Sequence, residues 1–366
     1  MTSIVFGAIS LDRMAGGLEK NIVLLANHFV RAGAQVSLVT FDRPGATAFY
    51  ELDPSIEWHK VGRTKPHSSI GFLERLKLII RIRNVIKKFD HPIVVCFHHG
   101  ILPRFYLAGL FLKIRLISSE RNSISFYKYI SQCKWSLGFM SLALTDRITV
   151  QFPSYVYDYP VWLRRRIRVI PNPVFKASTF ANPDVPGIVG RYRLLAVGRI
   201  CAQKNQKALI NAFAALHGEF PEWDLHFLGD GEEIKELENL IHKNSLTGRV
   251  FFWGNQQDVS SWLKSAHLFC MPSSWEGFPN ALAEAMAHGL PCIGLSDCAG
   301  VKDLIVNGKS GCLTKIGQLE QSIRELMRSP IKRSEMGRAS KDLVLIYTPK
   351  DAFCKWDELI AEIDFF

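Results

Sequence analysis

Two glutamates eight residues apart, Glu276 and Glu284, can bind a ligand that carries several hydroxyl groups. Carboxylate oxygens accept hydrogen bonds from the hydroxyls of sugars. The residues between them predict a turn that opens a helix, because proline is favoured in a first helical turn. The unpaired N–H groups of such a helix favour a phosphate. We therefore expect one carboxylate to bind a sugar and the other a ribose, with a diphosphate between them. The turn consists of Gly277, Phe278, Pro279 and Asn280.

A pair of cations, Arg199 and Lys204, follows Gly198 at the end of an expected strand over residues 193–197. Ligands of doubly wound sheets bind at the carboxyl ends of strands. Two cations at that place can neutralise a departing diphosphate without Mg²⁺. The sequence has no Asp-x-Asp pair of the kind that holds a metal in other sugar-transferring enzymes. We therefore expect neither a metal nor another cofactor.

The first half of the chain carries further candidates at expected strand ends. Gly16 and Gly17 open an expected helix, where glycine lets the backbone approach a phosphate closely. His98 follows an expected strand over residues 92–97, and we expect it to position and polarise a ligand. Glu120 and Arg121 end another strand and are candidate contacts to an acceptor. A salt-bridged strand end is the alternative interpretation of that pair.

Strand and helix patterns alternate along the chain, which predicts parallel sheets with helices on both faces. The length of 366 residues exceeds one ordinary core and indicates two domains. Two prolines that flank Asn172 predict a stiff extended exit from the first domain. We expect domains over residues 1–172 and 173–348, followed by an amphipathic helix over 349–366.

Composition and targeting signals favour a reducing cytoplasm. The chain start lacks the basic segment and long apolar core of a signal peptide. The longest apolar run, residues 101–117, is too short to span a membrane and is interrupted by charges. The eight cysteines form no Cys-x-x-Cys pair and no cluster with histidine, so neither a zinc site nor a disulfide framework is indicated.

The cations of the chain are concentrated in its first half. Residues 1–170 hold 24 Lys and Arg against 11 Asp and Glu, whereas the whole chain holds 45 against 34. This asymmetry indicates a local anionic partner. An expected basic helix over residues 72–89 can lie against an anionic membrane, and the alternative is that its apolar side packs on the sheet while the cations are solvated. The candidate membrane contacts are Lys77, Arg81 and Lys88.

Three segments together resemble motifs of the family-4 retaining glycosyltransferases. The run 275–291 resembles the donor-site motif, in which seven residues separate two glutamates and Gly-Phe-Pro follows the first. Residues 198–204 resemble the Gly-Arg…Lys motif, and residues 16–19 resemble the Gly-Gly-x-Glu loop. In this family, the loops that contain Gly231 and Gly254 shape the nucleotide pocket. Residues 299–303 resemble a further Gly-Gly-x-x-Glu loop, but Ala and Asp replace two of its residues.

The resemblance implies a fold and an activity. The fold is GT-B: two Rossmann-like doubly wound α/β domains that face a cleft, with the last helix crossing back to the first domain. The activity is transfer of a sugar, with retention and without metal, from a nucleotide-sugar, for which we expect UDP-hexose or UDP-N-acetylhexosamine. Arg199 and Lys204 stabilise the leaving diphosphate, Glu284 holds the ribose and Glu276 the donor sugar, with His98 close to that sugar.

The acceptor implied by the basic first domain is a lipid-linked or membrane-associated glycan. Such acceptors belong to the synthesis of bacterial surface polysaccharide, lipopolysaccharide or glycolipid. We therefore expect a peripheral enzyme on the inner face of the cytoplasmic membrane. Three alternatives stay open: a nucleotide-sugar epimerase of the same fold, a non-catalytic nucleotide-sugar-binding protein, and a nucleic-acid-binding protein. No nucleic-acid motif supports the last alternative.

Overall fold

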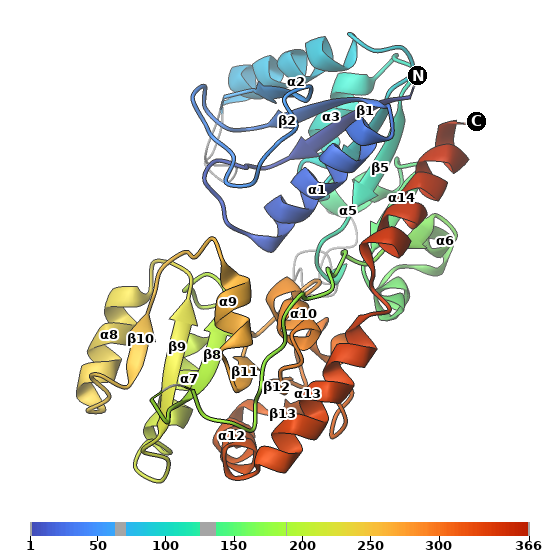
Figure 1. The fold of residues 1–366 in the computed structure, drawn as a ribbon. Coiled ribbons are helices and arrows are strands. Elements are labelled where there is room, and N and C mark those ends of the chain that lie inside the picture. The colour runs from blue at the N-terminus through green and yellow to red at the C-terminus, as the bar shows by residue number, and fades with distance from the viewer. Residues whose placement is uncertain (1, 63–70, 125–136, 188, 365–366) are drawn as a thin grey trace. The chain divides into compact units, whose positions relative to one another are not determined.

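The chain folds into two compact units in a computed structural model that describes residues 2–62, 71–124, 137–187 and 189–364 (Figure 1). The first unit comprises Met1–Asn172 together with Lys350–Phe366, and the second comprises Pro173–Pro349. Each unit is built around one parallel sheet with helices on its faces. The expected fold class, two doubly wound α/β domains with a final helix that returns to the first, is confirmed.

The first sheet has seven parallel strands in the order β3-β2-β1-β4-β5-β6-β7. The central strands are buried on both faces, as their continuous apolar sequences require. Two strands, β3 and β6, were not predicted from the sequence. β3 is a short, partly exposed edge strand of mostly polar residues, which gives no apolar signal. The strands are β1 (Ser3–Ala8), β2 (Gln35–Thr40), β3 (Glu57–Lys60), β4 (Ile93–Cys96), β5 (Arg115–Ser119), β6 (Arg147–Val150) and β7 (Ile167–Val169).

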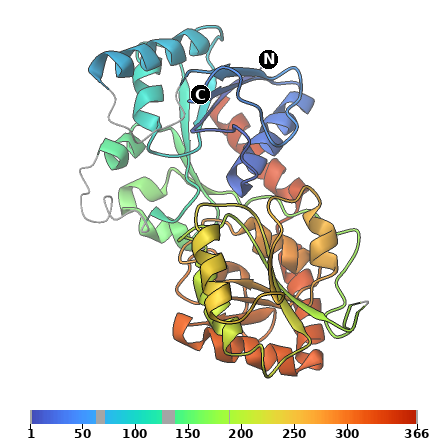
Figure 2. The ribbon, with the colours of Figure 1, turned by 90° about the vertical axis from the view of Figure 1, so that its left-hand side faces the viewer.

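Helices cover both faces of the first sheet, with α1 and α14 on one face and α2 and α3 on the other (Figure 2). Apolar residues of α1 and α14 join those of the strands in one core. One predicted helix is shorter than expected, since α2 ends at Ile86 and not at residue 89. The helices are α1 (Gly17–Arg31), α2 (Phe72–Ile86), α3 (Leu102–Gly109), α5 (Leu137–Leu142), the 3-10 helix η2 (Pro153–Asp158), α6 (Val161–Arg164) and α14 (Pro349–Asp364).

The final helix is held to the first unit by apolar and ionic contacts. Trp356 and Ile360 are buried in the core beneath the sheet. Glu362 accepts hydrogen bonds from two arginines of neighbouring strands, Arg147 on β6 and Arg168 on β7, both at 2.6 Å. α14 therefore belongs structurally to the first unit, although it follows the second in sequence.

The second sheet has six parallel strands in the order β10-β9-β8-β11-β12-β13. The strand order reverses at β8, because β9 and β10 are added on one side of it and β11, β12 and β13 on the other. A reversal of this kind leaves a crevice at the carboxyl ends of the two central strands. The strands are β8 (Tyr192–Val197), β9 (Trp223–Leu228), β10 (Val250–Phe252), β11 (Leu268–Met271), β12 (Cys292–Leu295) and β13 (Gly311–Thr314).

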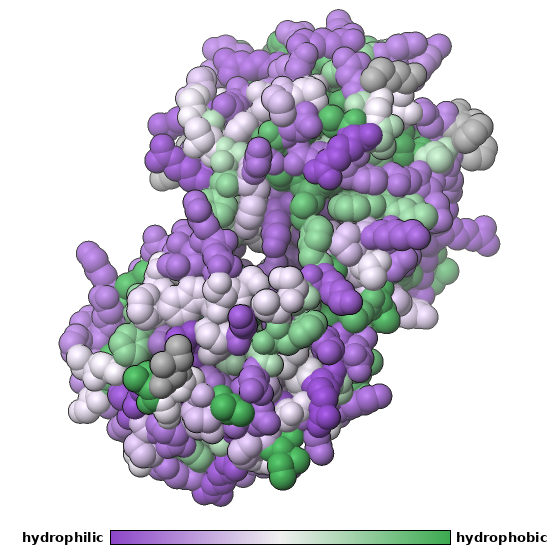
Figure 3. Space-filling model, viewed as in Figure 1, coloured by the Kyte–Doolittle hydropathy of each residue, from purple (hydrophilic) through white to green (hydrophobic). Residues whose placement is uncertain are grey.

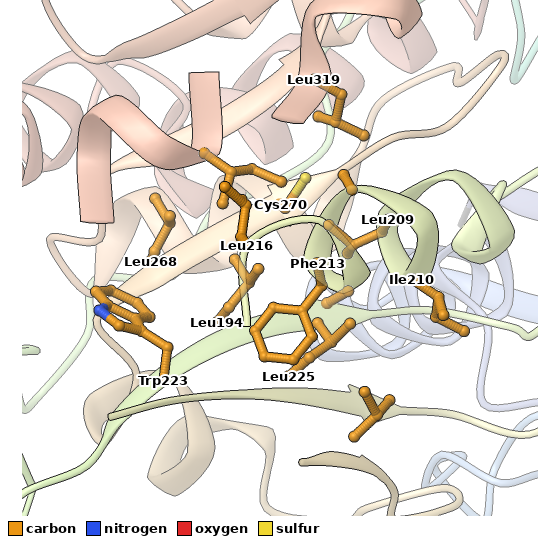
Figure 4. Close-up of a cluster of buried hydrophobic side chains, with 14 of the residues drawn as sticks. Leu194, Leu209, Ile210, Phe213, Leu216, Trp223, Leu225, Leu268, Cys270 and Leu319 are labelled. Atoms are coloured by element: carbon orange, nitrogen blue, oxygen red, sulfur yellow. The ribbon is translucent and has the colours of Figure 1, made fainter. Parts of the chain in front are cut away.

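The core of the second unit joins the sheet to α7 and α12 (Figure 4). Leu194 and Leu225 of the strands share this core with Phe213 of α7 and Leu319 of α12. Hydrophilic side chains predominate on the face drawn in Figure 3, with hydrophobic ones in small groups between them. The helices are α7 (Gln206–Ala214), α8 (Ile234–Lys243), α9 (Val259–Lys264), α10 (Asn280–Ala287), α11 (Val301–Leu304), the 3-10 helix η3 (Ile316–Gln318), α12 (Leu319–Arg328) and α13 (Pro330–Val344).

One buried arginine ties the elements beneath the second sheet together. Arg333 of α13 is 1% exposed and donates hydrogen bonds to the carbonyl oxygens of Pro183, Leu326 and Met327. The last two carbonyls lie in the final turn of α12, where no intrahelical donor is available. The guanidinium also lies 4.9 Å and 5.0 Å from the ring centres of Tyr192 and Trp223. Arg333 therefore satisfies three acceptors and packs on two strand residues.

We predict that Arg333→Met lowers the free energy of unfolding by about 3 kcal/mol, because three buried carbonyls lose their donor. Equilibrium denaturation followed by tryptophan fluorescence measures this loss. The control is Arg338→Met on the exposed side of the same helix, expected to change stability by less than about 0.5 kcal/mol. Equal effects of the two substitutions would contradict the role assigned to Arg333.

Candidate functional site

Two of the predicted catalytic residues meet at the reversal point of the second sheet. Lys204 lies in the loop after β8, and Glu276 lies in the loop after β11. The ammonium group of Lys204 donates to Glu276 Oε1 at 2.6 Å. The side chains are 18% and 8% exposed. Partners on adjacent loops thus neutralise a cation and a carboxylate that are both largely removed from water.

The two loops that carry this ion pair are joined along their backbones. The carbonyl oxygen of Gln203 accepts from the N–H of Ser274 at 2.8 Å. The side-chain amide of Gln203 donates to the carbonyl oxygen of Trp275 at 2.9 Å. Gln203 adjoins Lys204 in sequence, and Trp275 adjoins Glu276. The two hydrogen bonds of Gln203 therefore fix the distance between the loops beside the ion pair. Sequence analysis missed Gln203, because a glutamine in a loop carries no signal of its partner.

The turn after Glu276 is packed into the unit. Gly277, Phe278 and Pro279 are buried, and the Phe278 ring meets Tyr347 edge-on at 5.6 Å. α10 begins at Asn280, so Pro279 takes the position just before the helix and not its first turn. Glu284 is half-buried in the second turn of α10. The carboxylates of the predicted pair thus lie on one continuous structure, one before the helix and one within it.

Arg199 differs from Lys204 in its surroundings. Its side chain is exposed, and among the described residues no ion pair involves it. Its carbonyl oxygen accepts from the side-chain amide of Gln206 at 2.7 Å, which ties the loop to the start of α7. An exposed guanidinium at the carboxyl end of β8 is accessible to an anionic ligand.

Glycines let the neighbouring loops approach one another. A Cβ added to Gly198, whose φ is +150°, would lie 3.1 Å from Lys204 Cε. A Cβ on Gly231 would lie 2.0 Å from the carbonyl oxygen of Ile200, in the loop after β8. Gly254, after β10, accepts at its carbonyl oxygen from the N–H of Gly229 at 2.8 Å. The loops after β8, β9 and β10 therefore lie side by side, with Gly198, Gly231 and Gly254 at their contacts.

A further loop, after β12, reaches the same carboxylate. Burial and, after it, the negative charge of Glu276 raise the pKa of Cys298 to about 12. This thiol stays protonated and neutral beside the ion pair. In the same loop, Gly300 N–H donates to Asp303 Oδ2 at 3.3 Å at the start of α11. Asp303 therefore contacts the backbone of its own helix, in the segment that only partly matched a family loop.

The first unit has an equivalent reversal point beside β1, which lies between β2 and β4. Gly16 and Gly17 stand at the start of α1, in the loop after β1. A Cβ on Gly16 would lie 2.0 Å from Glu19 Oε2, so the absence of a side chain makes room for that carboxylate. The predicted glycine loop is therefore present, with Glu19 folded back over its own helix start.

His98 follows β4 on the other side of this reversal point. Its Nδ1 accepts a hydrogen bond from the Gly100 N–H at 2.8 Å. An acceptor nitrogen carries no proton, so the neutral ring holds its proton on Nε2. The ring stacks on that of His99 with centres 4.4 Å apart. His98 is thereby arranged as a hydrogen-bond donor through Nε2.

His99 and Glu120 form a fully buried pair behind His98. His99 Nδ1 lies 2.5 Å from Glu120 Oε2, and Ser118 Oγ donates to Oε1 at 2.7 Å. Burial opposes the charge of Glu120, but His99, His98 and Ser118 together lower its pKa to about 2. Burial also opposes the charge of His99, and Glu120 outweighs it, so the pKa of His99 lies above its usual value. This geometry favours a paired strand end over direct contact between Glu120 and an acceptor.

Arg121, the other acceptor-side candidate, is bound within the first unit. Its Nη1 donates to Asn172 Oδ1 at 2.9 Å, and its guanidinium lies 4.8 Å from the centre of the Phe97 ring. Burial lowers the pKa of Arg121 to about 10, against the opposing charge of Glu120. Arg121 thus links the end of β5 to the residue where the first unit ends.

The three candidate membrane contacts on α2 have partners within the first unit. Lys77 pairs with Glu74 at 3.1 Å, and Lys88 pairs with Glu57 at 3.0 Å. Arg81 donates to the carbonyl oxygen of Val61 at 2.8 Å. These contacts do not bring the cations together as one patch. No helix in the described ranges is both long and apolar enough to cross a bilayer.

Comparisons with known proteins identify both units. Residues 15–175 match the family described as Glycosyltransferase Family 4. Residues 181–343 match the family described as Glycosyl transferases group 1. The second match lies within the second structural unit. The first match lies within the first unit except for its last three residues, 173–175, which belong to the second.

Three proteins illustrate the similarity. A UDP-Gal:alpha-D-GlcNAc-diphosphoundecaprenol alpha-1,3-galactosyltransferase of Escherichia coli is 33% identical over 285 residues, 71% of this chain and 72% of that protein. A GalNAc-alpha-(1->4)-GalNAc-alpha-(1->3)-diNAcBac-PP-undecaprenol alpha-1,4-N-acetyl-D-galactosaminyltransferase of Campylobacter jejuni is 24% identical over 361 residues, 95% and 96% of the two chains. The structure of sucrose-phosphate synthase from Thermosynechococcus elongatus covers 99% of both chains at 18% identity with a TM-score of 0.80.

The structural likeness confirms the GT-B fold. The family matches and the 33% identical galactosyltransferase confirm the resemblance seen in the sequence. The chain belongs to the family-4 glycosyltransferases and is a glycosyltransferase.

Proposed function

We propose that this glycosyltransferase moves a sugar from a UDP-sugar to a lipid-linked glycan, with retention of the anomeric configuration and without a metal. The observation that carries the donor part of this proposal is the Lys204–Glu276 ion pair at the reversal point of the second sheet. This pair supports the proposal because it offers a cation to a diphosphate and a carboxylate to sugar hydroxyls. Ligands of doubly wound sheets bind at such a point.

The second unit binds the donor in this proposal. Lys204 and the exposed Arg199 contact the diphosphate, while Glu276 and Glu284 accept hydrogen bonds from the donor sugar and the ribose. A lysine ammonium has three donor hydrogens, so Lys204 can hold Glu276 and a phosphate oxygen together. The backbone N–H groups of Gly277 and Phe278 precede α10, and the start of a helix favours a phosphate.

The acceptor part rests on the relatives. The Escherichia coli and Campylobacter jejuni proteins are named for acceptors on diphosphoundecaprenol and polyprenyl diphosphate carriers. The first is named for UDP-Gal as donor, and the second transfers an N-acetylhexosamine. A UDP-hexose or UDP-N-acetylhexosamine donor and a lipid-diphosphate glycan acceptor fit both relatives. The product then enters the synthesis of a bacterial surface polysaccharide or lipopolysaccharide.

In the reaction, the bond between the anomeric carbon and the UDP oxygen breaks and a bond to the acceptor hydroxyl forms on the same face. The acceptor proton passes to the leaving phosphate oxygen, so no protein carboxylate becomes a covalent intermediate. Arg199 and Lys204 stabilise the charge that develops on UDP. The first unit offers a hydrogen-bond donor at His98 Nε2 and backbone N–H groups in the Gly16 and Gly17 loop.

A transfer assay tests this function. The purified enzyme is incubated with UDP-galactose, UDP-glucose or their N-acetylated forms and a short-chain lipid-diphosphate glycan. Mass spectrometry then detects the extended product, and NMR gives its anomeric configuration. We expect an alpha-linked product from an alpha-linked donor. A beta-linked product would overturn retention, and conversion of the donor without transfer would favour an epimerase.

We predict that Glu284→Ala weakens the binding of UDP-sugar by about 10- to 100-fold, because a hydrogen bond to a charged group is lost. Isothermal titration with the UDP-sugar used in the transfer assay measures this change. The matched control is Glu238→Ala, an exposed glutamate on α8, which is expected to bind as the parent does. Unchanged binding in Glu284→Ala would remove Glu284 from the nucleotide site.

We predict that Lys204→Met lowers kcat by about 10²- to 10³-fold, since a preorganised cation at the leaving group is removed. Steady-state kinetics of transfer give kcat and KM separately. The control is Lys207→Met at the start of α7, where the lysine is 58% exposed and pairs with Glu236. A Lys204 variant that changes KM alone would place this lysine in ground-state binding and not in catalysis.

We predict that treatment with EDTA followed by removal of the chelate leaves the rate of transfer unchanged, because Arg199 and Lys204 supply the positive charge at the diphosphate. The transfer assay is repeated with added Mg²⁺ or Mn²⁺ to test whether either ion raises the rate. A rate that falls on chelation and returns with either ion would contradict this prediction.

A further inference from the structure

A fully buried ion pair lies at the carboxyl edge of the first sheet and has no direct role in sugar transfer. His99 follows β4 and Glu120 follows β5, and both side chains are 0% exposed. Taking two charges out of water costs free energy that their attraction often fails to return, so apolar side chains of similar size can stabilise such a place equally well. Stability alone therefore does not account for this pair, which indicates that it acts on a neighbouring group.

Both oxygens of the Glu120 carboxylate are held by side chains of the first unit. His99 Nδ1 lies 2.5 Å from Oε2, and Ser118 Oγ donates to Oε1 at 2.7 Å. Burial opposes both charges, but each partner keeps the other ionised: the pKa of Glu120 falls to about 2, and that of His99 rises. Rotation of the His99 ring would break a charge-assisted hydrogen bond in a place that water does not reach. The ring is therefore held in one orientation.

The ring of His98 lies against this pair. Its centre is 4.4 Å from the centre of the His99 ring, with 25° between the two ring planes. Since His99 is charged, the contact joins a cation to the face of a neutral aromatic ring, which is an attractive arrangement. One face of the His98 ring is thus supported by a side chain that Glu120 in turn holds in place.

The turn after β4 fixes the edge of the same ring. Nδ1 of His98 accepts a hydrogen bond from the N–H of Gly100 at 2.8 Å. A Cβ on Gly100 would lie 2.7 Å from Nδ1 and 3.0 Å from Cε1, so a side chain at this position would displace the ring. With Nδ1 as an acceptor, the neutral ring carries its proton on Nε2. An N–H donor on a half-buried ring suits the oxygen of a sugar hydroxyl.

We propose that His99 and Glu120 are positioning residues for sugar transfer, which hold the His98 ring so that its Nε2–H meets a sugar oxygen of the substrate. This inference rests on the proposed function, because it takes His98 as a group that touches substrate. A catalytic side chain keeps a productive geometry only when its own supports are locked by packing and hydrogen bonds. Glu120, which the sequence marked as a contact to the acceptor, then acts through two histidine rings and not by contact.

A double-mutant cycle on the rate of transfer tests this proposal. The paired variant His99→Leu with Glu120→Leu replaces the ion pair by apolar side chains and leaves no lone charge, so the unit should stay folded. We expect its kcat to fall roughly tenfold, because the His98 ring loses its support. His98→Ala should lower kcat by about 10²-fold, and the paired substitutions should then cause less than about a twofold further loss. A further tenfold loss in the His98→Ala background would overturn the proposal, since the pair would then act without His98.

Two further variants make the test specific. Ser119→Ala with Thr149→Val removes a buried hydrogen bond of 2.8 Å at the same strand end, and this control should transfer at the rate of the parent. An equal loss in the control would overturn the proposal, because any disturbance of the strand end would then suffice. Glu120→Gln keeps the size of the side chain, and we expect a roughly threefold loss of kcat as a charged hydrogen bond becomes a neutral one. This milder variant serves the same cycle if the paired variant does not fold.

Nitrogen NMR of the histidine rings gives a second readout that requires no transfer. In protein with isotope-labelled histidine, His98 should appear as one neutral tautomer with its proton on Nε2, assigned by the signals missing in His98→Ala. In the variants of His99 and Glu120, we expect the two tautomers to average, because the ring can turn away from Gly100. An unchanged His98 spectrum would overturn the positioning role and leave the proposed function in place. A parent that transfers no sugar but shows the expected spectra would overturn the function and leave the support of the ring in place.

Discussion

The reversal of strand order at β8 in the parallel sheet of the second unit is the constraint on which the candidate donor site depends. Because β8 and β11 are neighbours in the sheet, the loops that follow them lie at the same carboxyl edge. Lys204 and Glu276 occupy these two loops, and Gln203 bonds one loop to the backbone of the other. A charged pair placed on rigid strand ends keeps its geometry better than one on long loops.

Close approach of backbones completes this edge. A side chain at Gly229 or Gly231 would meet the carbonyl oxygen of Gly198 at 2.1 Å or of Ile200 at 2.0 Å, and a side chain at Gly198 would meet Lys204 of its own loop at 3.1 Å. Larger residues would push the loop after β8 away from those after β9 and β10, and Lys204 would move with it. The glycines therefore act on the site through spacing and not through their own polar groups. The first unit uses Gly16 in the same way, where the missing side chain makes room for Glu19.

The sequence predicted those features that a local pattern encodes. Apolar runs separated by turns revealed most strands, and the spacing of Glu276 and Glu284 revealed the donor loop. Pairings between distant segments have no local signal: the bonds from Gln203 to Trp275, from Arg333 to Pro183 and from His99 to Glu120 join residues whose partners are known only from the fold. Glu120 was read as an acceptor contact because strand ends commonly bind ligands, whereas its burial follows from the packing of β4 beside β5. The spacing of apolar residues in α2 likewise predicts a helix but does not show which of these residues are buried against the unit.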